Sequence, residues 1–205
     1  MKNKGGNIFI VIGLVLIGAA LIITFNNIRE NIVAEKSSRE TVSCLKEQIY
    51  NGEISPYTGD ENNEPIYKQY SDMTMPEIEI DGERYIGILS IPDLDLELPV
   101  RGDFSYKGLT TAPCRYSGSI YKDDMIIAGH NYAAHFGYLN RLDPDGEVSF
   151  TDGDGNEFNY RLREIVQLNE TDTEEMVEGD WDLTLFTCNL SGRNRITLRF
   201  DRISK

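Results

Sequence analysis

The sequence predicts an all-β domain with short helices, folded as a closed or nearly closed barrel or as a sandwich, and preceded by a transmembrane helix. Three observations support this prediction. The region after residue 76 alternates short strand-like segments with turn residues, it contains no repeated strand–helix–strand unit, and the chain opens on a long apolar segment. Many short strands at such spacing are typical of barrels and sandwiches, because a sheet must bury its apolar face.

The apolar segment covers residues 8–25 and carries no charge. As a helix it would extend about 27 Å, close to the thickness of the hydrocarbon core of a bilayer. It is longer than the apolar core of a cleaved signal peptide, so we expect an uncleaved anchor. Lys2 and Lys4 should keep residues 1–7 in the cytoplasm as a short tail. The rest of the chain would then lie outside the cell, attached to the lipid bilayer by a single pass.

Residues 26–75 connect the anchor to the domain. Apolar residues spaced between charges in residues 26–50 fit either a juxtamembrane helix or a solvated stalk. Residues 51–76 are rich in Gly, Pro, Asn, Asp and Ser, which is typical of a linker or of an arm lying on a domain. The folded domain is therefore predicted to cover residues 76–205.

The strand-like segments of this domain share β-branched and aromatic residues bounded by turn residues. They are Tyr85–Ile91, Leu94–Val100, Met125–Ala128, Glu147–Thr151, Glu157–Leu168, Leu183–Thr187 and Arg195–Phe200. Short helical turns are expected at 136–142 and 171–177. The sequence DGDGNE at 152–157 is faintly like a calcium loop, but a hairpin turn between two strands is the better interpretation.

The chain is acidic, with a formal net charge of −14, and Lys2 and Lys4 are the charged residues among the first 28. An acidic domain repels phosphate backbones, which argues against a nucleic-acid partner. The three cysteines are Cys44, Cys114 and Cys188. Their number is odd, so at least one thiol is unpaired unless it bonds another chain. Cys44 and Cys114 could be inert or paired with each other.

The last two predicted strands form a hairpin that would bring a thiol beside a guanidinium. In residues 195–200 apolar and polar side chains alternate, so Arg195 should face outward. In the preceding strand Leu183 and Leu185 should point inward and Cys188 outward, which puts Cys188 and Arg195 on one solvent-facing surface. A thiolate is a strong nucleophile, and a nearby guanidinium favours that anion and can stabilise an oxyanion.

His130 ends a strand-like run, and the flanking Gly129 and Asn131 indicate a turn that exposes its ring. An imidazole can take or give a proton near neutral pH. His135 is expected to be a structural or surface residue. The spacing of His130, His135 and Cys188 matches no familiar zinc motif, so we expect no metal and no cofactor.

Several segments together resemble the sortase family. They are TLFTC at 184–188 with Arg195 seven positions later, AGHN at 128–131, and YIGILSIPDLDLELPV at 85–100. The resemblance covers about residues 76–205 and implies a closed eight-stranded β-barrel with Cys, His and Arg in a groove on its wall. It also implies a cysteine transpeptidase of the Gram-positive cell surface. Such an enzyme cleaves an LPxTG-like sorting signal through a thioacyl enzyme and transfers the surface protein to an amine of a peptidoglycan precursor or of pilin.

The resemblance assigns a role to each matching residue. Cys188 would attack the scissile carbonyl, and His130 would protonate the leaving amine and later deprotonate the incoming one. Arg195 would stabilise the oxyanion or orient the peptide. Arg193 is the alternative if the hairpin register is shifted, although strand parity favours Arg195.

Thr187 and Asn131 are expected to contact substrate, Thr187 through its hydroxyl or its backbone, although plain strand propensity explains Thr187 equally well. The class within the family stays open. HFGYL at 135–139 resembles the class B type, yet residues 169–180 are too few for the long helix of that class. The lid sequence and second apolar span common in pilin-polymerising sortases are not found in the sequence, which makes that class less favoured.

Two other functions fit part of the sequence. A cell-wall cysteine peptidase would use the same thiol and imidazole, but papain-like enzymes place the cysteine before the histidine and often at the start of a helix. Here His130 comes first and Cys188 ends a strand. A non-catalytic, membrane-tethered β-domain that keeps its cysteine for packing is the other alternative.

Overall fold

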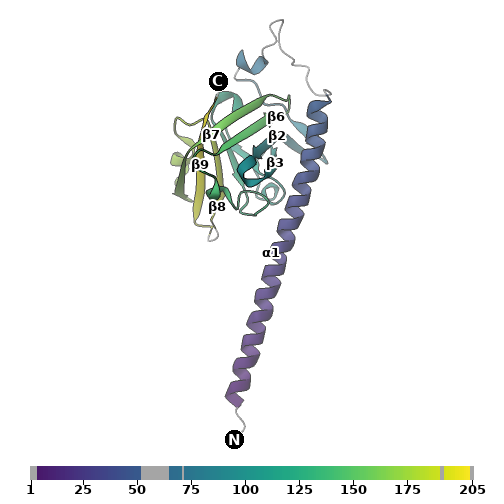
Figure 1. Ribbon diagram of the computed structural model, residues 1–205, viewed down its shortest axis with the longest axis vertical. Coiled ribbons are helices and arrows are strands. Elements are labelled where there is room, and N and C mark those ends of the chain that lie inside the picture. Colours follow the sequence, from purple (N-terminus) through teal and green to yellow (C-terminus); the bar gives the residue numbers. More distant parts are fainter. Residues whose placement is uncertain (1–3, 52–64, 71, 190–191, 204–205) are drawn as a thin grey trace. The chain divides into compact units, whose positions relative to one another are not determined.

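The computed structural model describes residues 4–51, 65–70, 72–189 and 192–203 (Figure 1). The chain divides into two compact units, one up to Val33 and the other from Ala34 onward. Much of the predicted linker at 51–76 therefore lies outside the described residues, apart from the short 3-10 helix η1 (Ile66–Lys68) and its neighbours.

The first element is the long helix α1 (Lys4–Tyr50). Within the described residues it is the one helix long and apolar enough to cross a membrane. The apolar side chains of residues 8–25 are mostly exposed, so no part of the described protein buries them. An N-terminal helix of this kind suggests a membrane anchor, because lipid is the environment that suits such a surface.

Nine strands of the described chain form a sheet that closes on itself (Figure 1). They are β1 (Ile78–Ile80), β2 (Glu83–Ile91), β3 (Leu96–Arg101), β4 (Cys114–Ser117), β5 (Met125–Gly129), β6 (Glu147–Asp152), β7 (Glu157–Asn169), β8 (Leu183–Cys188) and β9 (Asn194–Arg202). The order is β1-β2-β3-β4-β5-β8-β9-β7-β6, and β6 also pairs with β2. The β2–β6 pairing closes the eight strands β2 through β9 into a barrel. β1 is a short strand added at the edge of β2. The predicted closed eight-stranded barrel is confirmed.

Two of these strands, β1 and β4, were not predicted, because each is too short to show an alternating pattern. β3 begins at Leu96 rather than Leu94, since Pro92–Leu94 forms the 3-10 helix η2 and Asp95 adopts a left-handed conformation with φ of 52°. The expected helical turns are short. They are α2 (Thr173–Val177) and the 3-10 helix η5 (Leu139–Arg141), and the chain also forms η3 (Gly108–Thr110) and η4 (Ile120–Lys122).

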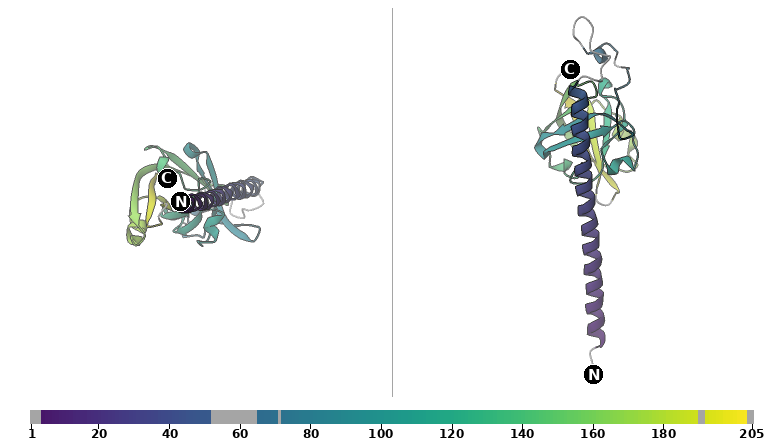
Figure 2. Two further views of the ribbon diagram at one scale, coloured as in Figure 1. Left: turned by 90° about the horizontal axis from the view of Figure 1, so that it is seen from below. Right: turned by 90° about the vertical axis from the view of Figure 1, so that its right-hand side faces the viewer.

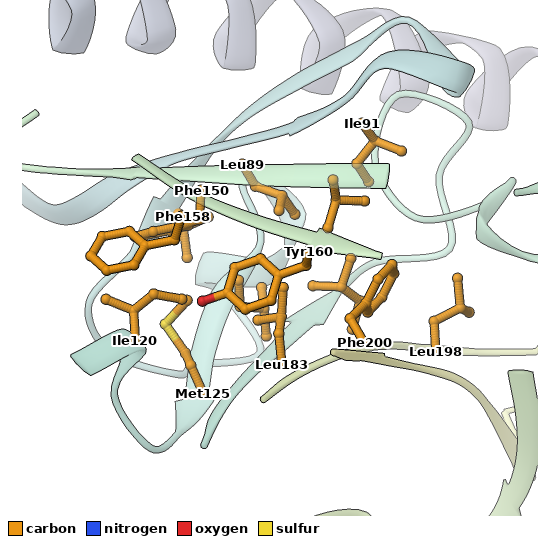
Figure 3. Packing of buried hydrophobic residues seen from close by; sticks show 14 of the residues in the cluster. Leu89, Ile91, Ile120, Met125, Phe150, Phe158, Tyr160, Leu183, Leu198 and Phe200 are labelled. Carbon is orange, nitrogen blue, oxygen red and sulfur yellow. The ribbon is translucent and has the colours of Figure 1, made fainter. Parts of the chain in front are cut away.

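Aromatic and aliphatic side chains from all sides of the barrel fill its interior (Figure 3). In the close-up, the ring of Tyr160 lies among Phe158, Phe200 and Leu183, and each of these four side chains is at most 1% exposed. In β8, Leu183 and Leu185 belong to this interior cluster, as strand parity predicts. Burying side chains of this size stabilises the fold by about 1.5–3 kcal/mol each, and the interior cluster therefore holds the barrel walls in place.

Residues 34–50 of α1 pack on the barrel within the second unit (Figure 2). Val42 and Leu45 are buried against side chains of the barrel and its loops, namely Ile78, Tyr85, Ile88 and Ala112. Lys46 adds an ion pair to Glu97, with Nζ 2.6 Å from Oε1. Residues 26–50 are thus helical, and residues 34–50 are packed rather than a solvated stalk. The domain start at residue 76 stays a prediction, but this helix segment belongs to the same compact unit.

The DGDGNE segment forms the turn between β6 and β7, which pair as an antiparallel hairpin. The carboxylate of the buried Asp152 accepts hydrogen bonds from the Tyr121 hydroxyl at 2.7 Å and from the backbone N–H groups of Asp154 and Asn156. The carboxylate therefore anchors the turn, which agrees with the hairpin interpretation.

Candidate active site

The β8–β9 hairpin places Cys188 directly opposite Arg195. Directly opposed residues of an antiparallel pair point to the same face of the sheet, with Cβ atoms about 4.5–5.5 Å apart. Cys188 is the last residue of β8 and is exposed. The register expected from the alternating pattern is the one observed, and it brings the thiol and the guanidinium together.

Two contacts hold the guanidinium of Arg195. Its Nη1 donates a hydrogen bond to the backbone carbonyl of Glu170 at 2.9 Å, and its central carbon lies 5.6 Å from the ring centroid of Phe186. A guanidinium carries five N–H donors, so one bond to a carbonyl does not exhaust it. Arg195 is thus oriented on the face that carries Cys188 and keeps donors for a further oxygen.

His130 reaches the same edge of the barrel from β5. β5 and β8 pair in parallel, and Gly129 lies beside Thr187 in the register. His130 directly follows Gly129, and Cys188 directly follows Thr187. Because the two strands are parallel, both residues lie just beyond the last β5–β8 pair, at the same edge of the barrel. β5, β8 and β9 are neighbours in the sheet, which gathers His130, Cys188 and Arg195 at adjacent strand ends.

The loop after β5 fixes the backbone and ring of His130. Gly129 is required there, because a Cβ at this position would lie 2.3 Å from the ring of the buried Phe136. The N–H of Phe136 donates to the carbonyl of His130 at 3.1 Å. The ring of Tyr132 stacks on the imidazole of His130, with centroids 3.8 Å apart and planes 18° apart. Tyr132 was not among the predicted site residues, although its position two residues after the histidine was a usable signal.

The structure does not bring every predicted residue to this surface. Thr187 is 1% exposed and points to the opposite face from Cys188, because neighbouring residues in a strand alternate. A hydroxyl contact from Thr187 to substrate is therefore disfavoured. Asn131 is half-buried beside His130, and Arg193 is exposed in the loop before β9.

His135 is fully buried, so it is structural rather than a surface residue. Its Nε2 lies 3.3 Å from Oγ of Ser38 in α1. Burial, and then the nearby His130, lower the pKa of His135 to about 4. The ring is consequently neutral at neutral pH.

The outer face of the hairpin is not open to solvent along its length, which corrects the sequence-based expectation. Thr184, Phe186 and Thr197 are all buried on this face. Phe186 belongs to an outer cluster with Ile126, Ala128, Leu168 and Met176, and Phe104, Leu109 and Val166 pack against it. The expectation failed because Met176 comes from α2 and Phe104 from a loop, and the strand pattern places neither. Cys188, at the strand end, stays exposed.

A row of aromatic rings extends from the outer cluster. Phe186, Tyr116, Phe104 and Tyr106 contact one another edge to face in that order, with centroids 5.3–5.5 Å apart. Tyr116 is 37% exposed and Tyr106 83% exposed. Phe186 lies two residues before Cys188 on the same face of β8, so this aromatic row begins beside the thiol. Phe186 was not among the predicted site residues, although its shared parity with Cys188 was a usable signal in the sequence.

All three thiols are free, so Cys44 and Cys114 are not paired with each other. Cys44 is exposed on α1, and Cys114 is buried in β4, where burial raises the pKa of its thiol. Across the described ranges, no group of three His, Cys, Asp or Glu side chains is arranged to hold a metal ion.

Comparison with known proteins places this geometry in a family. The model of the sortase domain matches residues 89–200. Sortase A of Bacillus anthracis is 26% identical over 168 residues, which cover 76% of this chain and 74% of that protein. Sortase C1 from Streptococcus agalactiae has a similar fold, with a TM-score of 0.61, 19% identity, and coverage of 81% of this chain and 99% of that one.

A sortase D5 transpeptidase from Clostridium perfringens is also similar in fold, with a TM-score of 0.58 and 17% identity. The match covers 82% of this chain and 99% of that one. At these identities the solved structures show that the fold is shared. The family model covers more than half of the chain. The chain belongs to the sortase family of cysteine transpeptidases.

Proposed function

We propose that this protein is a sortase in which Cys188 is the nucleophile, His130 the acid and base, and Arg195 the cation that stabilises the oxyanion. The observation that carries the proposal is the strand register. Cys188 lies opposite Arg195, and β5 pairs with β8 so that His130 follows the last paired residue beside Cys188. Three residue types suited to acyl transfer thus meet at one exposed edge of the barrel.

The acylation step uses all three side chains. The thiolate sulfur of Cys188 attacks the scissile carbonyl carbon of a sorting signal, and the carbonyl oxygen becomes an oxyanion that the guanidinium of Arg195 binds. The C–N bond then breaks. The imidazolium of His130 gives its proton to the departing amine, which leaves a thioester on Cys188 and a neutral His130.

The transfer step reverses these roles. An amine attacks the thioester carbonyl, His130 accepts the proton that the amine loses, and the C–S bond breaks to return the thiolate. The product is a new amide, and the enzyme regains the protonation state in which it began. This sequence needs no oxidant, reductant or cofactor.

The aromatic row supports a peptide with apolar side chains as the acyl donor. Its rings lead away from Cys188, from the buried Phe186 to the exposed rings of Tyr116 and Tyr106, and exposed aromatic faces suit leucine and proline side chains. We therefore propose an LPxTG-like sorting signal at the C-terminus of a surface protein as substrate. Asn131 and the backbone of Thr187 would contact the peptide near the scissile bond.

The acceptor and the cellular setting follow from the same proposal. The acceptor would be an amine of a peptidoglycan precursor or of pilin. Residues 1–7 would form the cytoplasmic tail, residues 8–25 the single membrane span and 26–75 the connection to a catalytic domain at 76–205. The apolar, exposed surface of the helix supports the span, and Lys2 and Lys4 support a cytoplasmic N-terminus.

A library of LPxTG-like peptides, incubated with the full-length protein in detergent and with amine acceptors, tests the proposal by mass spectrometry. We expect a thioester adduct on Cys188 and an amide product when the acceptor is present. Cys44→Ala is a matched control, because it removes an exposed thiol on α1 and should leave both products unchanged.

Two results would contradict the proposal. Release of a carboxylic acid alone, even at high acceptor concentration, would mean a peptidase. An adduct on Cys44 with none on Cys188 would mean that the barrel edge is not catalytic.

A further inference from the structure

A contact between residues 97 positions apart joins α1 to the loop that follows His130. Oγ of Ser38 lies 3.3 Å from Nε2 of His135, and both residues are buried, at 3% and 0% exposure. Ser38 belongs to the part of α1 that packs on the barrel through Val42 and Leu45. The contact therefore lies inside one compact unit and is backed by an apolar interface.

The His130 loop connects this contact to the imidazole of His130. Two N–H groups, those of His135 and Gly137, donate to the carbonyl of Tyr132, at 3.0 and 2.8 Å. The ring of Tyr132 lies between the two histidines, stacked on His130 at 3.8 Å and 5.8 Å from the centroid of His135. A shift of the His135 ring would therefore reach Tyr132, and through the stack it would reach His130.

The charge states of the two histidines suit this arrangement. Burial and the neighbouring His130 lower the pKa of His135 to about 4, so His135 remains neutral when His130 binds a proton. A neutral imidazole has one donor and one acceptor, and a serine hydroxyl can serve either. The contact with Ser38 is thus maintained throughout a cycle in which His130 gains and loses its proton.

We propose that Ser38, His135 and Tyr132 are positioning residues, through which residues 34–50 of α1 hold the ring of His130 at the thiol. Residues 34–50 of α1 then contribute to catalysis as well as connecting the domain to the N-terminal helix. This inference rests on the proposed role of His130 as acid and base.

The test compares Ser38→Ala with Ser43→Ala in the full-length protein in detergent. Ser43 is an exposed serine one and a half turns further along the same helix, so both variants make the same chemical change and both keep a good helix former. We expect Ser38→Ala to lower kcat about 10-fold with little change in KM, because a misplaced general acid slows chemistry rather than binding. Ser43→Ala should change neither.

A spectroscopic readout separates positioning from simple support of the fold. The chain has two histidines, so an NMR spectrum of ring-labelled histidine holds two imidazole signals, and His135→Gln assigns them. We expect Ser38→Ala to move the signal of His130 as well as that of His135. In a Tyr132→Ala background, Ser38→Ala should cause no further loss of kcat, because the path to His130 is already broken.

An unchanged kcat with an unmoved His130 signal would overturn the proposal. A kcat loss that is fully additive with Tyr132→Ala would also overturn it, since the two residues would then act separately. His130→Ala with undiminished turnover would instead refute the proposed role of His130, and the ring signals would still report whether Ser38 positions that side chain.

Discussion

The interior of the barrel and the outer cluster beside Cys188 are both apolar, yet they differ in how they are closed. The interior is sealed by eight strands, and residues such as Tyr160, Phe158 and Phe200 are at most 1% exposed there. Within the described residues, the side chains that pack on the outer cluster from outside the sheet come from α2, from the loop that carries Phe104 and from Leu109 in η3. Its aromatic row ends in the exposed ring of Tyr106.

This difference separates stability from function within single strands. In β8, Leu185 faces the sealed interior, whereas Phe186 faces the outer cluster and leads to Cys188. A change on the inner face should therefore unfold the barrel. A change at an exposed position of the outer face, such as Cys188 or Tyr116, should leave the barrel folded and affect substrate or catalysis.

The largest effect is expected at the strand end. Cys188→Ala should lower transpeptidation by at least about 10³-fold, because it removes the proposed nucleophile. Thermal unfolding should stay near that of the wild type, since the exposed thiol contributes little to packing. The comparison of turnover with circular dichroism melting checks both. Cys188→Ala protein that fails to fold would break the distinction between the two faces.

The second prediction contrasts one residue from each region. Phe200→Ala should reduce the free energy of unfolding by about 3–5 kcal/mol through the cavity it leaves. Tyr116→Ala, on the partly exposed aromatic row, should change stability far less and raise KM for an LPxTG-like peptide about 10-fold with kcat preserved. Urea titration and steady-state kinetics on both variants test the contrast. A raised KM for Phe200→Ala in the fully folded state would contradict it.

Variants of the two arginines near the hairpin turn, Arg193 and Arg195, test which of them acts in the site. Arg195→Ala should lower kcat/KM about 10²-fold, because it removes the guanidinium that we propose binds the oxyanion. Arg193→Ala should lower it far less, since Arg193 lies in the loop and not opposite Cys188. The same peptide assay on both variants decides between them. If Arg193→Ala proved the more damaging change, the guanidinium that acts in the site would be that of Arg193 and not that of Arg195.

The sequence predicted the parts of this site that depend on local pattern. Alternation in residues 195–200 predicted which side of β9 carries Arg195, and the observed register agrees. The pairing of β5 with β8 could not be predicted from local pattern, because it joins segments far apart in the chain. Only the family resemblance placed His130 near Cys188.

Other features were missed for the same physical reason. The outer cluster and the Ser38–His135 contact depend on loops and on a helix that dock from outside the sheet. Strand periodicity carries no information about what covers a strand. Burial of Thr187 could have been predicted, since it shares its parity with Leu183 and Leu185.

The smallest predicted effect concerns pH and His135. Its pKa is about 4 in the folded protein and about 6.5 when unfolded, so the unfolded chain binds more protons between these values. The stabilisation that the neutral, buried ring of His135 gives to the folded state is complete above about pH 6.5 and is lost as the pH falls towards 4. Between pH 7 and pH 5 it should fall by about 2 kcal/mol.

Urea titrations of wild type and His135→Gln at several pH values check this contribution. Between pH 7 and pH 5 the free energy of unfolding of the variant should fall by about 2 kcal/mol less than that of the wild type. Parallel curves for the two proteins would mean that His135 does not titrate in this way.

The central claim is that Cys188, His130 and Arg195 act together on the outer face of the β5–β8–β9 wall. A crystal structure of the protein with a sorting-signal peptide trapped covalently on Cys188 tests it most directly. We expect the oxygen that derives from the scissile carbonyl within hydrogen-bond distance of Arg195, His130 beside the leaving-group position, and apolar peptide side chains on the exposed rings of Tyr116 and Tyr106. A trapped peptide that runs away from the aromatic row, with its oxygen out of reach of Arg195, would contradict the account.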